Sequence, residues 1–187
     1  MCLQVTGEVL QVFGVHTQTI PTAPPVWDMT TYDTELILSR TVTITGTRST
    51  GHKSLTEYAQ LFSAYLGPFA TGAHFYIGGA KGIDSLSLVW LAGNTQAALT
   101  VVVPGTVEQQ PAEARQAIAR VRERISEMVE LAAPDLNSAS YHARNRWMVD
   151  RSSMTIGFPL AGQLQSGTWQ TLNYTRGQGK PHLVVPI

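Results

Sequence analysis

From residue 40 onward, short apolar runs alternate with glycine-marked turns and amphipathic stretches. The apolar runs are TVTITG (41–46), HFYIGG (74–79), ALTVVVPG (98–105), MTIGFP (154–159) and HLVVP (182–186). Runs of this length that end at glycine or proline are typical of strands, and continuous apolar runs are typical of parallel strands covered on both faces. We therefore expect five core strands.

Helical spacing of apolar residues appears between these runs. In SLTEYAQLFSAYLG (54–67), Ser54 is the expected N-cap and Gly67 the expected stop signal. Further helices are predicted over 83–93, 111–131, 141–153 and 166–179. The alternation predicts an α/β, Rossmann-like, three-layer fold in which helices cover both faces of a mainly parallel sheet.

Residues 1–39 have a different pattern. Residues 5–15 alternate loosely, and PTAPPVWD (21–28) cannot be helical because its prolines fix the backbone and remove donors. We predict an N-terminal extended or β arm (1–39) that packs on one core domain (40–187).

Composition narrows the range of function classes. The 187 residues carry no formal net charge, so no global field draws the protein to nucleic acid or to a membrane. The single cysteine, Cys2, excludes a disulfide framework and a cysteine-rich metal site. We find no signal peptide and no run long enough to span a membrane, so a cytoplasmic protein is expected.

Three glycine-marked turns are expected at the carboxyl edge of the sheet, where each lies after a predicted strand or before a predicted helix. They are GTRST (46–50), GGAKGID (78–84) and QSGT (165–168). Ligands of such sheets bind at this edge, where helix N-terminal amides favour anions. With Arg48 and Lys81 nearby, a phosphate is the natural ligand. Each turn also has a purely structural interpretation, as a tight turn or a helix cap.

The segment YHARNRWMVDR (141–151) is a second candidate. Arginine suits phosphate geometry, so Arg144 and Arg146 can contact an anion. The alternative is a structural helix in which Arg146 pairs with Asp150 and Trp147 stacks on Arg151. The five histidines show no metal spacing, and we interpret them as non-catalytic, with His52 and His142 near the site.

Together these segments resemble the DNA-processing protein A family (DprA, or Smf) within the SLOG group of nucleotide-binding domains. The similar stretches are PPVW (24–27), VTITGTRS (42–49), GGAKGIDSLSL (78–88), VVVPGT (101–106), ARNRWMVDRSS (143–153), SGTWQTLNY (166–174) and GKPHLVVP (179–186). The resemblance implies a SLOG-type sheet. It also implies a ligand site formed by Gly46, Thr47, Arg48, Gly78, Gly79, Lys81, Gly82, Asp84, Arg144, Asn145, Arg146, Ser166, Gly167 and Thr168. Ser49, in the same turn as Arg48, is a further candidate.

DprA proteins bind single-stranded DNA and help to load recombinase, whereas the lonely-guy branch of the group hydrolyses nucleoside monophosphates to a free base. That branch has Pro-Gly-Gly-x-Gly-Thr-x-x-Glu, and here Thr171 occupies the acid position. We therefore expect non-catalytic binding of a nucleotide or short single-stranded DNA. No catalytic residue, metal or cofactor and no membrane partner is expected. The alternatives are a phosphoribohydrolase that cleaves the N-glycosidic bond and a scaffold module without a working site. A homodimer is compatible with the sequence, and a recombinase partner follows from the resemblance alone.

Overall fold

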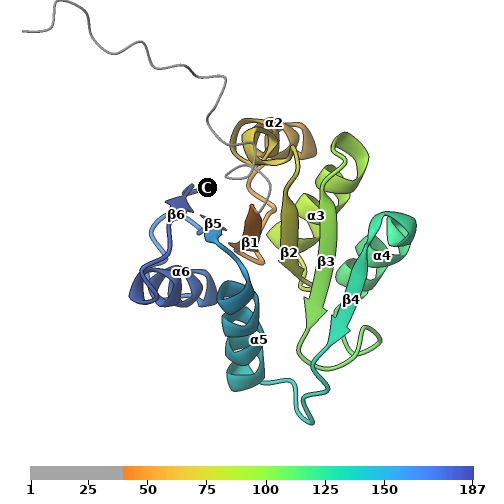
Figure 1. The fold of residues 1–187 in the computed structure, drawn as a ribbon, viewed down its shortest axis with the longest axis vertical. Coiled ribbons are helices and arrows are strands. Elements are labelled where there is room, and N and C mark those ends of the chain that lie inside the picture. The colour runs from red at the N-terminus through yellow and green to blue at the C-terminus, as the bar shows by residue number, and fades with distance from the viewer. Residues whose placement is uncertain (1–39) are drawn as a thin grey trace, which may run out of the picture. The chain divides into compact units, whose positions relative to one another are not determined.

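The computed structural model describes residues 40–187, so the predicted arm over 1–39 lies outside the described residues. Strands and helices alternate along this part of the chain (Figure 1). The strands are β1 (Thr41–Gly46), β2 (His74–Gly78), β3 (Ala98–Val103), β4 (Glu127–Glu130), β5 (Met154–Phe158) and β6 (His182–Val184). The α-helices are α2 (Leu55–Tyr65), α3 (Ile83–Asn94), α4 (Ala112–Arg120), α5 (Ser138–Arg151) and α6 (Gly167–Gly177).

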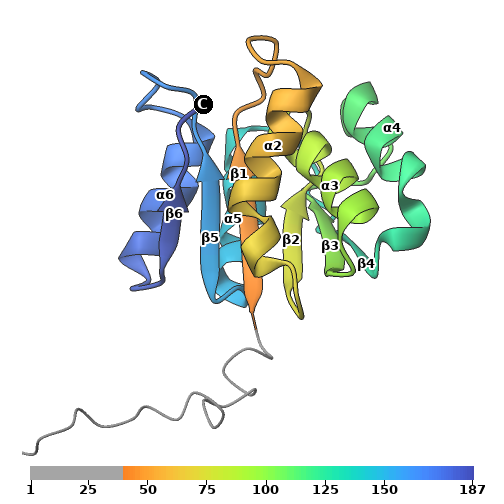
Figure 2. The same cartoon turned by 90° about the horizontal axis from the view of Figure 1, so that it is seen from above.

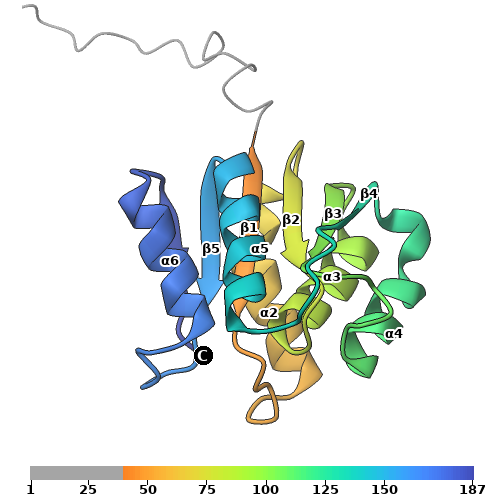
Figure 3. The ribbon, with the colours of Figure 1, turned by 90° about the horizontal axis from the view of Figure 1, so that it is seen from below.

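All six strands of residues 40–187 form one parallel sheet in the order β4-β3-β2-β1-β5-β6. Helices α2, α3 and α4 cover one face, and α5 and α6 cover the other (Figures 2 and 3). This confirms the predicted three-layer α/β fold. The strand order reverses between β1 and β5, and ligands of open α/β sheets bind at such a switch point. None of the described helices has the length and apolar character needed to cross a membrane.

The two faces of the sheet differ in chemistry. In β1, Val42 and Ile44 belong to the apolar core. The alternate residue Thr43 donates from Oγ1 to Oγ of Ser152, at the end of α5, at 2.9 Å. Thr155 in β5 pairs in the same way with Thr175 of α6, with 2.8 Å between the hydroxyl oxygens. Because these buried hydroxyls bond to one another, threonine is tolerated in the interior of the sheet.

The predicted start of α2 is confirmed by its capping. The Ser54 hydroxyl accepts from the Glu57 amide at 3.3 Å, and the Glu57 carboxylate accepts from the Ser54 amide at 2.8 Å. This reciprocal pair satisfies two amides that the helix itself leaves free.

The single helix predicted over 111–131 is wrong. Helix α4 ends at Arg120, a 3₁₀ turn follows, and β4 then pairs in parallel with β3 at the sheet edge. No glycine or proline marks the break, and in the four-residue strand Met128 and Val129 continue the helical spacing. Arg124 secures the turn by donating to three carbonyls at the end of α3, a contact that the local pattern does not reveal.

Candidate functional site

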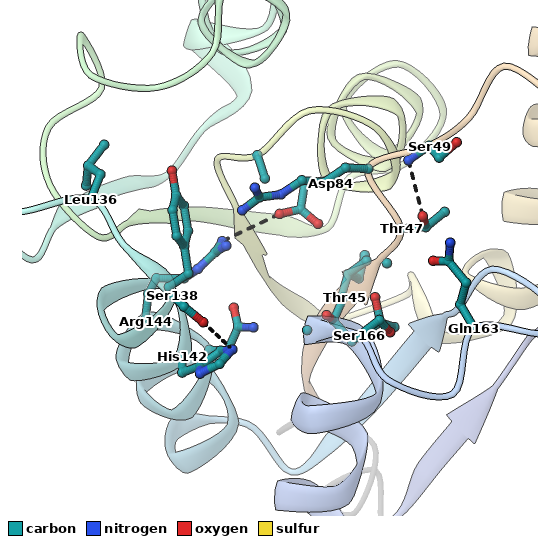
Figure 4. Close-up of a pocket in the computed structure, with 18 of the residues that line it drawn as sticks. Thr45, Thr47, Ser49, Asp84, Leu136, Ser138, His142, Arg144, Gln163 and Ser166 are labelled. Atoms are coloured by element: carbon teal, nitrogen blue, oxygen red, sulfur yellow. Dashed lines mark hydrogen bonds and ion pairs between the residues drawn. The ribbon is translucent and has the colours of Figure 1, made fainter.

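A cavity of about 670 Å³ opens at the carboxyl edge of the sheet, where the strand order reverses. The loop after β1 and the first turns of α3, α5 and α6 line it (Figure 4). The structure brings ten of the predicted residues to this lining: Gly46, Thr47, Arg48, Ser49, Asp84, Arg144, Asn145, Ser166, Gly167 and Thr168. It does not bring Gly78, Gly79, Lys81, Gly82 or Arg146 to it.

The loop after β1 contributes an exposed cation. The Arg48 guanidinium carbon lies 4.6 Å from the centre of the Tyr141 ring, in a cation–π arrangement that joins this loop to α5. Within the same loop the Thr47 amide donates to Phe158 O at 3.0 Å, and the Ser49 amide donates to the Thr47 hydroxyl at 3.1 Å. The loop therefore offers mainly side-chain charge to a ligand.

The turn before α6 is open. Ser166 is the N-cap and accepts from the Trp169 amide at 3.3 Å. The amides of Gly167 and Thr168 have no acceptor among the described residues, and a Cβ added at Gly167 would meet nothing within 4 Å. The first turn of α6 also carries no acidic residue. Free amides at the positive end of the helix dipole form a favourable anion site.

In contrast, the turn before α3 is filled by the protein itself. The Gly82 amide donates to Glu113 Oε1 at 2.8 Å, and the Ile83 amide donates to Thr47 O at 3.1 Å. The Gly79 amide donates to Val102 O at 3.3 Å. Lys81 is exposed. The glycines of GGAKGID thus lie in a turn whose amides bond mainly within the chain.

Close packing also explains the glycines of this turn. A Cβ at Gly78 would collide with Nη1 of Arg144. Gly82 has φ of +81°, and a Cβ there would lie 2.6 Å from the carbonyl oxygen of Thr47. The backbone of the α3 turn approaches protein atoms closely, so glycine is required without any ligand.

A buried ion pair forms one side of the cavity. Arg144 Nη1 lies 3.5 Å from Asp84 Oδ2, with the two side chains 5% and 8% exposed. Nη1 also donates to Val102 O at 3.4 Å, while the buried Nε has no partner among the described residues. Burial raises the pKa of Asp84 to about 6, and the charges of Arg144 and Arg48 oppose this shift.

The two arginines of the RNR segment have different surroundings. Arg146 is exposed and lines a smaller hollow of about 170 Å³ between α5 and α6. The predicted pair with Asp150 is wrong, because Asp150 Oδ1 accepts from the Tyr174 hydroxyl at 2.8 Å instead. The predicted stacking of Arg151 on Trp147 is confirmed, with 3.9 Å from the guanidinium carbon to the ring centre.

Sequence reasoning missed part of the lining. Helix α5 begins at Ser138, and Asn137, Ser138 and Tyr141 from its start face the cavity. Helical spacing provides the signal, since residues three and seven positions before Arg144 share its side of the helix. His142 lines the cavity, whereas His52 lies beside Tyr58, with 3.4 Å between the hydroxyl oxygen and Nε2.

Three observations describe the metal-ligating and acidic side chains of the site. Within residues 40–187, no three histidine, cysteine or acidic side chains gather as a metal site. Thr171, at the acid position of the hydrolase motif, donates to Gly167 O at 2.8 Å and accepts from Asn145 Nδ2 at 2.8 Å. Asp84 is the only acidic residue of the described lining, and it is paired.

Comparisons with known proteins agree with this architecture. The profile of the family described as DNA recombination-mediator protein A matches residues 12–187. A search of curated proteins gave no match.

Among solved structures, DNA processing protein A from Helicobacter pylori, described for its single-stranded DNA binding mode, aligns with a TM-score of 0.60 at 21% identity. The alignment covers 83% of this chain and 69% of that one. DNA processing protein A from Streptococcus pneumoniae aligns with a TM-score of 0.51 at 15% identity, over 80% of this chain and 60% of that one. At these identities the similarity shows a shared fold.

Proposed function

Because the chain belongs to the DNA recombination-mediator protein A family, we propose that it binds single-stranded DNA, without cleaving it, at the cavity beside β1 and β5. One observation carries this proposal. The free amides of Gly167 and Thr168 and the exposed guanidinium of Arg48 line the same cavity. The H. pylori relative, described for its single-stranded DNA binding mode, supports the choice of ligand.

The proposed contacts follow from the chemistry of a phosphodiester. Its oxygens accept hydrogen bonds from backbone amides, and the N-terminal end of the α6 dipole stabilises their negative charge. Arg48, on the loop after β1, adds a cation to the same cavity. Beside it, the Tyr141 ring provides an aromatic surface of the kind on which bases stack in single-stranded nucleic-acid sites.

The contact with the strand is proposed to be short. The cavity volume falls within the range of small-ligand sites. The chain has no net charge, which favours a short contact over a long DNA track. A free nucleotide presents the same phosphate chemistry and is therefore the natural competitor of the DNA strand.

A binding titration tests the proposal. Fluorescence anisotropy of a labelled oligothymidine should show saturable binding that weakens as salt is added. Arg48→Ala should weaken binding about tenfold, since it removes one charge-assisted contact. Arg115→Ala is the matched control, because Arg115 is an exposed arginine on α4 outside the cavity lining, and it should change the affinity less than about twofold.

Two results would contradict the proposal: no binding of the oligonucleotide by the wild-type protein, or equal weakening by both substitutions. Competition with a nucleoside monophosphate separates the two ligands. A nucleotide that displaces the DNA at much lower concentration than an unlabelled oligonucleotide would reassign the cavity to nucleotide binding.

The hydrolase alternative has one observation in its favour. Asp84 lies in the lining, and its raised pKa of about 6 suits a general acid. Its ion pair with Arg144 favours a structural role instead. Incubation with nucleoside monophosphates decides between them, because release of free base would establish hydrolysis and its absence is what we expect.

Two further proposals concern partners: a homodimer, with which the sequence is compatible, and a recombinase, which the resemblance to the family implies. Light scattering after gel filtration tests the first, and co-purification with a bacterial recombinase on single-stranded DNA tests the second.

A further inference from the structure

The guanidinium of Arg144 is only partly satisfied. Within residues 40–187 its hydrogen bonds all come from Nη1, at 3.5 Å to Asp84 and 3.4 Å to Val102 O. The residue is only 4% exposed, and its buried Nε has no hydrogen-bond partner among the described residues. A guanidinium has five donors in a planar fork, and leaving one unpaired in the interior is costly. The cavity that Arg144 lines is where a further acceptor can reach it.

Several charged or titratable groups line the cavity together with the Asp84 carboxylate or lie close to it. Helix α5 contributes Arg144, together with Tyr141 and His142 in the same lining, and the loop after β1 contributes Arg48. Glu113 of α4 is bound nearby, at the Gly82 amide. Two cations therefore share one cavity with a buried carboxylate, and a phosphate entering this cavity competes with that carboxylate for the same cations.

We propose that Asp84 is a positioning residue whose carboxylate holds Arg144 in the absence of ligand and takes up one proton when a phosphodiester binds beside it. The proton comes from solvent and adds to a carboxylate oxygen, and no bond of the ligand changes. Once it is neutral, Asp84 no longer forms an ion pair with Arg144, and the guanidinium of Arg144 binds the phosphate instead. This inference rests on the proposed function.

The direction of the pH dependence follows from linkage. A bound anion raises the pKa of Asp84 above its value of about 6 in the free protein, because like charges disfavour each other. Between the two pKa values, binding takes up a proton, so affinity rises as pH falls. Below the lower pKa, Asp84 is already protonated and the affinity levels off. The phosphodiester groups and thymine bases of oligothymidine keep their charge over this interval.

The test measures the affinity for oligothymidine at pH 6 and pH 8, at fixed ionic strength. The wild-type protein should bind about tenfold more tightly at pH 6. Asp84→Asn, a neutral isostere, should bind equally at both pH values, and at pH 8 at least as tightly as the wild type does at pH 6. His142→Gln is the control for the histidine in the lining, and it should keep the tenfold ratio.

Tight wild-type binding that is equal at both pH values would overturn this inference alone. A pH ratio that survives in Asp84→Asn and disappears in His142→Gln would also overturn it. Absence of wild-type binding at both pH values would overturn the proposed function and this inference with it.

If Asp84→Asn does not fold, calorimetry of His142→Gln in two buffers of different ionisation enthalpy counts the protons directly. Net uptake on binding of oligothymidine at pH 7 is expected, and zero uptake or release would overturn the inference.

Discussion

The turn before α3 (78–84) and the turn before α6 (165–168) both place glycine beside a helix N-terminus at one edge of the sheet, but they differ in what fills them. In the α3 turn, the Gly82 amide is bonded to Glu113, and side-chain and carbonyl atoms occupy the space beside the glycines. In the α6 turn, the amides of Gly167 and Thr168 are free of acceptors in the described chain, and the space beside Gly167 is open.

This difference shows that a glycine-marked turn does not by itself indicate a ligand site. What distinguishes the two turns is whether the protein itself supplies acceptors for the amides and fills the space beside the glycines. In the α3 turn the acceptor is a carboxylate 31 residues away in sequence. In the α6 turn the amides of Gly167 and Thr168 have no acceptor among residues 40–187, and the first turn of the helix carries no acidic residue. We therefore propose that the anion site lies at the α6 turn, where Arg48 lines the same cavity.

The largest expected effect is a difference in the free energy of unfolding between alanine variants of the two turns. Gly82→Ala should lower the free energy of unfolding by about 3 kcal/mol, because alanine is strained at φ of +81° and its Cβ meets backbone atoms of Thr47 and Arg48. Gly167→Ala should change it by less than about 1 kcal/mol, since the added methyl group enters open space. Urea denaturation of both variants measures the difference, and equal losses would remove the distinction between the turns.

The next effect is a difference in oligonucleotide affinity between Lys81→Ala, in the α3 turn, and Arg48→Ala, in the cavity lining. Lys81→Ala should weaken oligonucleotide binding less than about threefold, because Lys81 is exposed and lies outside the cavity lining. Arg48→Ala should cost about tenfold and should also reduce the salt slope of binding by about 0.7. Titrations at several salt concentrations give both quantities. If Lys81→Ala weakened binding as much as Arg48→Ala, the result would indicate that the bound strand contacts the α3 turn.

The smallest effect concerns Glu113 as the acceptor that closes the α3 turn. Glu113→Ala should lower the stability by about 1 kcal/mol, since the Gly82 amide loses its acceptor. Glu113→Gln keeps an oxygen at that position and should cost less. Chemical denaturation of the two variants provides the comparison. If both are as stable as the wild type, the bond between Glu113 and Gly82 is not what closes the turn.

Local pattern was sufficient for most of the fold. The Ser54 cap, the apolar strands and the glycine ends of helices are encoded within a few residues, so they could be predicted. The strand β4 could not, because its four residues continue the helical spacing of α4, and Arg124 fixes the break through contacts with the end of α3.

The site was predictable only to the level of the sheet edge. Arg144 and Arg146 are both arginines of the RNR segment, and the sequence pattern alone does not distinguish them. Their positions around α5 bury the first beside Asp84 and expose the second. The bond from Gly82 to Glu113 joins two helices, so no local motif announces it. Tyr141 is likewise found only when the helical spacing from Arg144 is continued towards the N-terminus.

Backbone amide chemical shifts test the assignment of the anion site most directly. Proton–nitrogen correlation spectra recorded during titration with oligothymidine report on both turns in one experiment. The account predicts the largest shifts at the amides of Gly167 and Thr168 and small shifts at Gly79 and Gly82. Large shifts at Gly79 and Gly82, with Gly167 and Thr168 unmoved, would contradict it.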